Sequence, residues 1–141
     1  MISIQRQKGA EIVEFALVLP LLLLILFGIM EFGIVFFDKA IITNASREGA
    51  RAGVVSRSPV LSNDDITTIV NNYSVGLVSF SSSVASPVVT VTTTTIAAEQ
   101  FLTVKVEYSY TFLVFGNLMS LFIPSFSNPI VLSASTVMRY E

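Results

Sequence analysis

An apolar run near the N-terminus limits the folds open to this chain more than any other feature. From Phe15 to Met30, sixteen consecutive residues carry no charge, and after Glu31 the apolar residues resume to Phe37. A helix needs about 20 mostly apolar residues to cross the hydrocarbon layer of a membrane, and this run has 23. A core helix of a soluble domain would carry polar residues every third or fourth position. The run therefore predicts a single transmembrane helix.

The charges before the run predict its orientation. Arg6 and Lys8 precede it, and no acidic residue comes before Glu11. The positive-inside rule places such a flank in the cytoplasm and the rest of the chain outside. A cleaved secretory signal has the same charge order, but its apolar core is only about 7–15 residues long. We therefore expect residues 1–9 to be a cytoplasmic leader and residues 10–37 to be the transmembrane helix.

Three residues of this helix are unusual for a plain anchor. Glu14 stands just inside the apolar run, where a carboxylate must be solvated at the headgroups or find a cation. Pro20 cannot donate a backbone hydrogen bond, so a kink or a loosened turn is expected there. Glu31 lies about 25 Å further along the helix than Glu14. It is therefore expected near the outer interface, where it reaches water or pairs with a cation on a partner helix.

The helix is expected to continue outside the membrane over residues 38–55, which contain no proline. A helix from Ala10 to Gly53 would be about 66 Å long, roughly twice the thickness of the membrane core. Its outer part must therefore pack on something. Ala45, Gly49 and Gly53 recur at four-residue spacing and allow close approach of another backbone. Either the chain's own head or a partner subunit would fill that space.

Two arginines on this continuation are expected to need acidic partners. Arg47 and Arg51 lie four residues apart, where like charges on a helix repel mildly. Beyond the neighbouring Glu48, the candidate partners on this chain are Glu107 and either Asp64 or Asp65.

Residues 56–141 predict a small α+β head. Asp64 to Tyr73 begins with acidic residues and continues with apolar residues at helical spacing, which is typical of a short amphipathic helix. The helix dipole accounts for these carboxylates better than a calcium site, which needs more oxygen ligands. Phe115 to Pro129 is an apolar loop or short helical turn that either tucks over the sheet or docks a partner.

Three segments of the head predict an antiparallel sheet. Val88 to Ile96 is rich in valine and threonine and is expected to be an exposed strand, such as one at the edge of the sheet. Phe101 to Phe112 alternates an apolar face with a polar one, and Ile130 to Tyr140 does the same. Sheets with one buried and one wet face are usually antiparallel. The predicted fold class is thus α+β: a long transmembrane helix extending into a head with a short helix and about three strands.

Composition argues against catalysis and nucleic-acid binding. The chain has no His and no Cys, so a Ser-His-Asp triad, a cysteine nucleophile and a zinc site all lack their key groups. The formal charge is −2, and without Arg6 and Lys8 it would be −2 − 2 = −4. Nucleic-acid binding needs a clustered positive face. We predict no enzyme, no metal and no cofactor.

Two motifs resemble a known family. The residues from Lys8 to Phe15 contain a Gly, four further residues, and then a Glu followed by an aromatic residue. This arrangement resembles the processing site of pilins and pseudopilins of the tight-adherence (Tad, or Flp) system. The following helix, and then Ala45 to Arg51, resemble the TadE-like pseudopilins specifically. The resemblance covers roughly Lys8 to Val55, and the motifs flank the helix in the right order.

The resemblance implies a function and partners. In that family a prepilin peptidase cuts after the Gly, here between Gly9 and Ala10, and the residues matching Glu14 and Phe15 serve processing or assembly. A proline at the place of Pro20 marks where the helix can stretch in a filament. The implied role is that of a minor pseudopilin in pilus biogenesis, initiation or the tip, and hence in adherence. Implied partners are the peptidase, pseudopilin and pilin subunits, platform proteins and membrane lipid, at the bacterial inner membrane or in a surface pilus.

Two other roles are alternatives to this one. An uncleaved single-pass scaffold or adhesin of the cell envelope would have the same anchor, and cleavage after Gly9 separates the two. A major filament subunit is disfavoured because Tad major pilins are much shorter. In either pilus role, the residues that face a partner or take part in helix packing would include Glu31, Arg47, Glu48 and Arg51.

Overall fold

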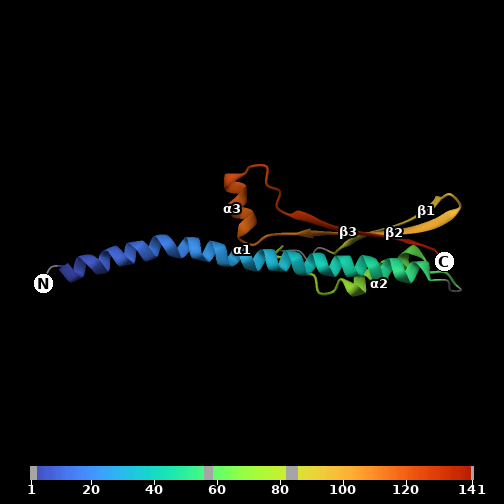
Figure 1. Ribbon diagram of the computed structural model, residues 1–141, viewed down its shortest axis with the longest axis horizontal. Coiled ribbons are helices and arrows are strands. Elements are labelled where there is room, and N and C mark those ends of the chain that lie inside the picture. Colours follow the sequence, from blue (N-terminus) through green and yellow to red (C-terminus); the bar gives the residue numbers. More distant parts are fainter. Residues whose placement is uncertain (1–2, 56–58, 82–85, 141) are drawn as a thin grey trace.

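The computed structural model describes residues 3–55, 59–81 and 86–140, with the backbone alone for residues 3–8 and 121–122. Its fold is a long helix that carries a small α+β head along one half (Figure 1). The predicted fold class is confirmed. The elements in chain order are α1 (Ser3–Val54), α2 (Asn63–Tyr73), β1 (Val88–Ile96), β2 (Glu99–Tyr110), α3 (Phe115–Phe122) and β3 (Ile130–Arg139).

Helix α1 has 52 residues and is continuous through Gly9 and Pro20, so it is about 78 Å long. Its N-terminal half stands free of the head, whereas its C-terminal half lies beside the sheet (Figure 1). Residues 3–9 of the predicted leader already belong to this helix. Those residues join an existing helix, which spares them the unfavourable nucleation step. Residues 1–2 of the predicted leader lie outside the described residues.

The three strands form one antiparallel sheet in the order β1-β2-β3, with β1 at an edge as predicted. The apolar face of β2 is buried as its alternation predicts, from Leu102 to Tyr110. This strand ends two residues before the predicted end at Phe112, whose backbone N–H donates to the side chain of Asn128 instead of to a strand. Helix α1 contacts β2 and β3, and α2 contacts β1. The two helices thus cover one face of the sheet.

Helix α2 begins one residue earlier than predicted because its cap lies further upstream. Ser62 is the N-cap: its side chain accepts from the backbone N–H of Asp65, and the Asp65 carboxylate accepts from the backbone N–H of Ser62. This reciprocal pair is a capping box, which satisfies two backbone donors at once. Ile66 and Val70 are the buried residues of α2, and they join the apolar face of β2 in the core.

Candidate functional site

The part of α1 that faces the head carries buried polar and small residues as well as apolar ones. Glu31, Asp38 and Ala45 lie seven residues apart and are 3, 0 and 0 % exposed. Ile42 and Gly49, which are buried as well, follow Asp38 and Ala45 by four residues. Positions spaced by four and three residues share one side of a helix. This row, from residue 31 to residue 53, is the docking face of α1, and the head is built against it.

Glu31 ties the start of α3 to α1. Its carboxylate accepts three backbone hydrogen bonds: Oε1 from Leu113 at 2.7 Å and from Val114 at 2.6 Å, and Oε2 from Phe115 at 2.8 Å. The first N–H groups of a helix have no partner within that helix. Val114, the N-cap residue of α3, makes no side-chain cap hydrogen bond. Glu31 therefore caps α3 from a different helix.

This arrangement corrects the prediction that Glu31 reaches water or pairs with a cation. The side chain is buried, and its charge faces backbone N–H groups at a helix N-terminus, where the helix dipole stabilises an anion. The two groups are complementary. A buried carboxylate requires hydrogen-bond donors, and the backbone N–H groups at the start of α3 require a hydrogen-bond acceptor. Neither group needs water to be satisfied.

Asp38 is a second buried carboxylate on the docking face, and sequence reasoning missed it. Its Oδ1 accepts from the backbone N–H of Val78 at 3.0 Å, while its Oδ2 has no hydrogen-bond partner among the described residues. Burial raises the pKa of the Asp38 carboxyl, although the hydrogen bond from Val78 acts in the opposite direction. The seven-residue spacing from Glu31 was the one sequence signal that both acids share a face.

Tyr110 is the buried neighbour of these charges. Its hydroxyl has no hydrogen-bond partner among the described residues. Burial, together with the negative charges of Glu31 and Asp38, raises the pKa of Tyr110 to about 12. The phenol therefore stays neutral at ordinary pH, and its ring packs edge-on against Phe112 with ring centroids 5.1 Å apart.

Polar contacts also join α1 to β3. The ammonium of Lys39 donates to the backbone carbonyl of Ser133. Further along the helix, the hydroxyl oxygens of Ser46 and Thr136 lie 2.8 Å apart, and Ser46 is buried. These contacts fix the position of β3 along α1, because apolar packing alone is not directional.

The small residues of α1 lie against the chain's own head. A Cβ at Gly49 would lie 2.5 Å from Val70 Cγ2 and 3.5 Å from Val104 Cγ1. A Cβ at Gly53 would collide with Leu102 and Ile66. Helix α1 can therefore approach α2 and β2 closely only because these positions lack side chains.

The arginines behave differently from the prediction. Arg51 pairs with Glu48, with Nη2 and Oε1 2.9 Å apart, while Glu107 pairs with Lys105. Asp65 is engaged in the cap of α2, and Arg47 is exposed. The predicted pairing of the arginines with acids of the head is therefore not observed for Glu107 or Asp65. The i,i+3 geometry of Glu48 and Arg51 already satisfies one arginine locally.

The predicted processing segment lies on the free half of α1, away from the docking face. Gly9, Ala10, Glu14 and Phe15 are all exposed, with Phe15 63 % exposed. A Cβ at Gly9 would meet nothing within 4 Å. The segment is thus open to another protein along its whole length.

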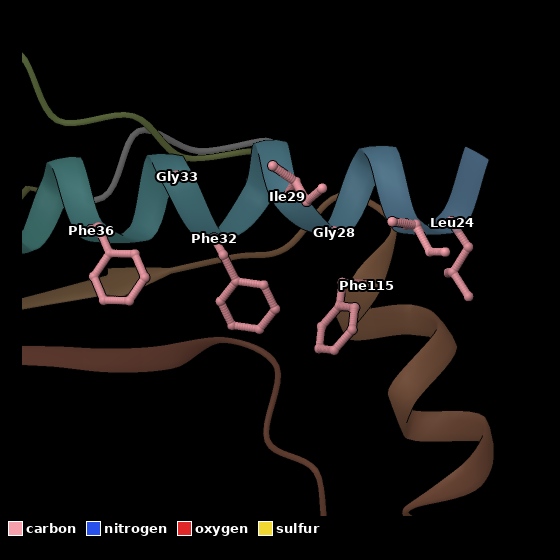
Figure 2. Close-up of a pocket in the computed structure, with 8 residues that line it drawn as sticks. Leu24, Gly28, Ile29, Phe32, Gly33, Phe36 and Phe115 are labelled. Atoms are coloured by element: carbon pink, nitrogen blue, oxygen red, sulfur yellow. The ribbon is translucent and has the colours of Figure 1, made fainter. Parts of the chain in front are cut away.

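An apolar groove of about 600 Å³ lies where α3 meets α1. It is lined by seven residues of α1 between Leu24 and Phe36 and by Phe115 of α3. Figure 2 shows Phe32 and Phe36 on the side of α1 on which α3 lies, with Phe115 beside them. The rings of Phe32 and Phe115 meet edge-on, with centroids 5.1 Å apart. This space is called the α1–α3 groove below.

Within the described residues, no three side chains of His, Cys, Asp or Glu come together in a way that could hold a metal ion. In the same part of the chain, α1 is the one helix long and apolar enough to cross a membrane. These features describe an anchor joined to a head.

One segment of the chain is similar to a known protein family. A family model described as TadE-like protein matches residues 9–51. This segment of the chain belongs to the TadE-like family. The match confirms the resemblance of the two motifs to this family. Members of the family are pilus components rather than enzymes. No curated protein and no solved structure matches significantly.

The TadE-like match covers both functional regions of α1. It begins at Gly9, in the predicted processing segment, and ends at Arg51, within the docking face. It therefore includes Glu31 and Asp38 but not the head elements that they contact. The long apolar helix suggests a single membrane anchor for the chain.

Proposed function

We propose that this chain is a minor pseudopilin of a bacterial Tad pilus machine. A prepilin peptidase cleaves it after Gly9, α1 anchors it in the inner membrane, and the head lies outside. The observation that carries the proposal is the TadE-like match, because it begins at the glycine of the processing motif and runs through the apolar helix. The exposed positions of Gly9, Ala10 and Glu14 support access by a peptidase.

Assembly would use the free half of α1. Glu14 and Phe15 are exposed there, and so is Pro20. A carboxylate within an apolar surface needs a cation, and the amine that cleavage creates on Ala10 of a neighbouring subunit supplies one. Partners are therefore other pseudopilin and pilin subunits, together with the platform proteins of the inner membrane.

A complementation experiment in a bacterium with a Tad system tests this role. The gene is deleted and replaced by wild type or by Gly9→Leu, Glu14→Ala or Glu11→Ala, and surface pili are counted by electron microscopy. We expect the deletion to lose pili, and wild type and Glu11→Ala to restore them. Gly9→Leu and Glu14→Ala should fail despite normal membrane levels by immunoblot. Normal piliation without the protein, or with Gly9→Leu, would refute the proposal and favour an uncleaved envelope scaffold.

A further inference from the structure

The underside of the head, meaning α3 and the residues that flank it from 113 to 123, lies beside the apolar part of α1. Glu31, which holds the start of α3, is six residues before Phe37, where the apolar run ends. Six residues of helix span about 9 Å. If Phe15 to Phe37 crosses the membrane, the start of α3 lies at the depth of the outer leaflet rather than in water.

The direction of α3 fits this depth. In Figure 1, α3 points steeply away from α1, at the end of the head nearest the free half of α1. Because α1 crosses the membrane, a helix at a steep angle to α1 runs roughly along the membrane surface. Amphipathic helices that bind bilayers lie in this orientation, with their apolar face buried about 5–10 Å deep.

The residues of this region are suited to lipid rather than to water. From Tyr108 to Met138 the chain has 31 consecutive residues without a charge. Leu113 is 51 % exposed and Ile123 is 48 % exposed, at the two ends of α3. The charged residues of the sheet, Glu99, Lys105, Glu107 and Arg139, all lie outside this stretch.

Several polar groups of α3 have hydrogen-bond partners within the protein. The Glu31 carboxylate accepts hydrogen bonds from the backbone N–H groups at the start of α3. Asn117 Nδ2 donates to the carbonyl of Leu113 at 3.3 Å, and the hydroxyl of Ser120 donates to the carbonyl of Asn117 at 2.8 Å. Backbone and side-chain polar groups in a bilayer must be satisfied internally. A protein-binding surface would be expected to have a polar, solvent-accessible rim.

We infer that the underside of the head inserts into the outer leaflet of the membrane and that a lipid acyl chain occupies the α1–α3 groove. The lining of the groove is apolar throughout, and it lies within the apolar run of α1. The head is then held at a defined height and angle on the membrane by two contacts, α1 and α3. This inference rests on the membrane anchor of the proposed function, but not on cleavage or on pilus assembly.

Fluorescence quenching by lipid tests the inference, because the chain contains no Trp. Single tryptophans are placed by Ile123→Trp on the underside, Ile96→Trp at the far end of β1, and Leu22→Trp within the apolar run. Ile123 and Ile96 are matched, since both are exposed isoleucines at 48 % and 60 %. Each variant of the full chain is reconstituted in phosphatidylcholine vesicles with or without acyl-brominated phosphatidylcholine, after circular dichroism confirms the fold.

We expect brominated lipid to remove most of the emission of Ile123→Trp and Leu22→Trp and to leave that of Ile96→Trp unchanged. Quenching of Leu22→Trp alone would overturn the inference while leaving the anchor intact. A blue-shifted but unquenched Ile123→Trp would mean that protein covers the underside, which also overturns it. If Leu22→Trp were unquenched, the anchor itself would fail, and the proposed function with it.

Discussion

Glu31 does for α3 what a side chain at the N-cap does for most helices, but it acts from a helix that is distant in sequence. Its hydrogen-bonded partners lie 82 to 84 residues away. The cap therefore also acts as a tertiary contact, because the N–H groups at the start of α3 reach the Glu31 carboxylate only when the head lies on α1. A single carboxylate links the anchor to the lower end of the head.

Removing this carboxylate should loosen α3. Glu31→Ala leaves three backbone donors without their acceptor, and each buried unsatisfied group costs about 1–3 kcal/mol. We expect faster amide hydrogen exchange at Leu113, Val114 and Phe115 and a lower melting temperature of the head in detergent. Glu14→Ala removes an exposed carboxylate from the same helix and should change neither. Unchanged protection of the three amides in Glu31→Ala would contradict the capping role.

Asp38 should make the stability of the head depend on pH. Burial raises the pKa of its carboxyl above the ordinary value of 3.8, so the folded state holds this proton more tightly than the unfolded state. Stability is therefore lost as pH rises from about 4 through the raised pKa. Asp38→Asn removes this charge and retains an oxygen acceptor for the N–H of Val78.

Thermal unfolding at two pH values measures this effect. We expect the melting temperature of Asp38→Asn, relative to wild type, to be higher at pH 7 than at pH 4. Glu14→Gln, which removes an exposed charge, serves as the control. The same difference between Asp38→Asn and wild type at both pH values would show that burial of the charge has no cost.

At the scale of the element, α1 and α2 fit together because one helix lacks side chains where the other has them. Gly49→Ala would place a Cβ 2.5 Å from Cγ2 of Val70, a buried and stiff side chain. Overpacking of this kind costs about 1–3 kcal/mol. We expect a lower melting temperature of the head by near-ultraviolet circular dichroism.

Gly33→Ala is the matched control for this substitution. A Cβ at Gly33 would meet nothing within 4 Å, so the same chemical change on the same helix should leave the head unaffected. A Gly49→Ala variant as stable as Gly33→Ala would mean that α1 and α2 do not pack as closely as the structure has them.

The turn between β1 and β2 is the clearest strained element. Ala97 and Ala98 have φ of 50° and 68°, which costs alanine roughly 1–2 kcal/mol per residue, and Ile96 pairs with Glu99 across them. Two-residue hairpin turns with positive φ prefer glycine at these positions. Ala98→Gly should therefore raise the melting temperature of the head. The same change at Ala40, an exposed position of α1, should not raise it, because glycine is unfavourable within a helix. A lower melting temperature for Ala98→Gly would contradict the conclusion that the turn between β1 and β2 is strained.

The elements could be predicted from sequence because each has a local pattern. The alternation in β2, the acidic start of α2 and the apolar run of α1 all depend on neighbouring residues. The contacts of Glu31 could not be predicted, since its partners are backbone N–H groups that carry no sequence signature. The small residues Ala45, Gly49 and Gly53 did predict a packing surface on α1, which the head fills. The burial of Asp38 on the same face was missed, because a carboxylate occupies a position where helical periodicity leads one to expect an apolar residue.

At the scale of the whole molecule, the chain is a rod with two different halves. The free half of α1 carries the exposed residues of the predicted processing segment, and the other half is covered by the head (Figure 1). A subunit built in this way can offer its anchor to neighbours without disturbing its head, because Gly9 to Pro20 make no part of the core. This division supports the pseudopilin proposal, in which the anchor assembles and the head remains outside.

The most direct test of that proposal is the intact mass and N-terminal sequence of the protein recovered from its native membrane, together with Gly9→Leu. We expect the wild type to begin at Ala10 and Gly9→Leu to keep residues 1–9, because a bulky side chain blocks the peptidase at the cleaved bond. A native protein that still begins at Met1 or Ile2 would contradict processing and with it the pseudopilin account.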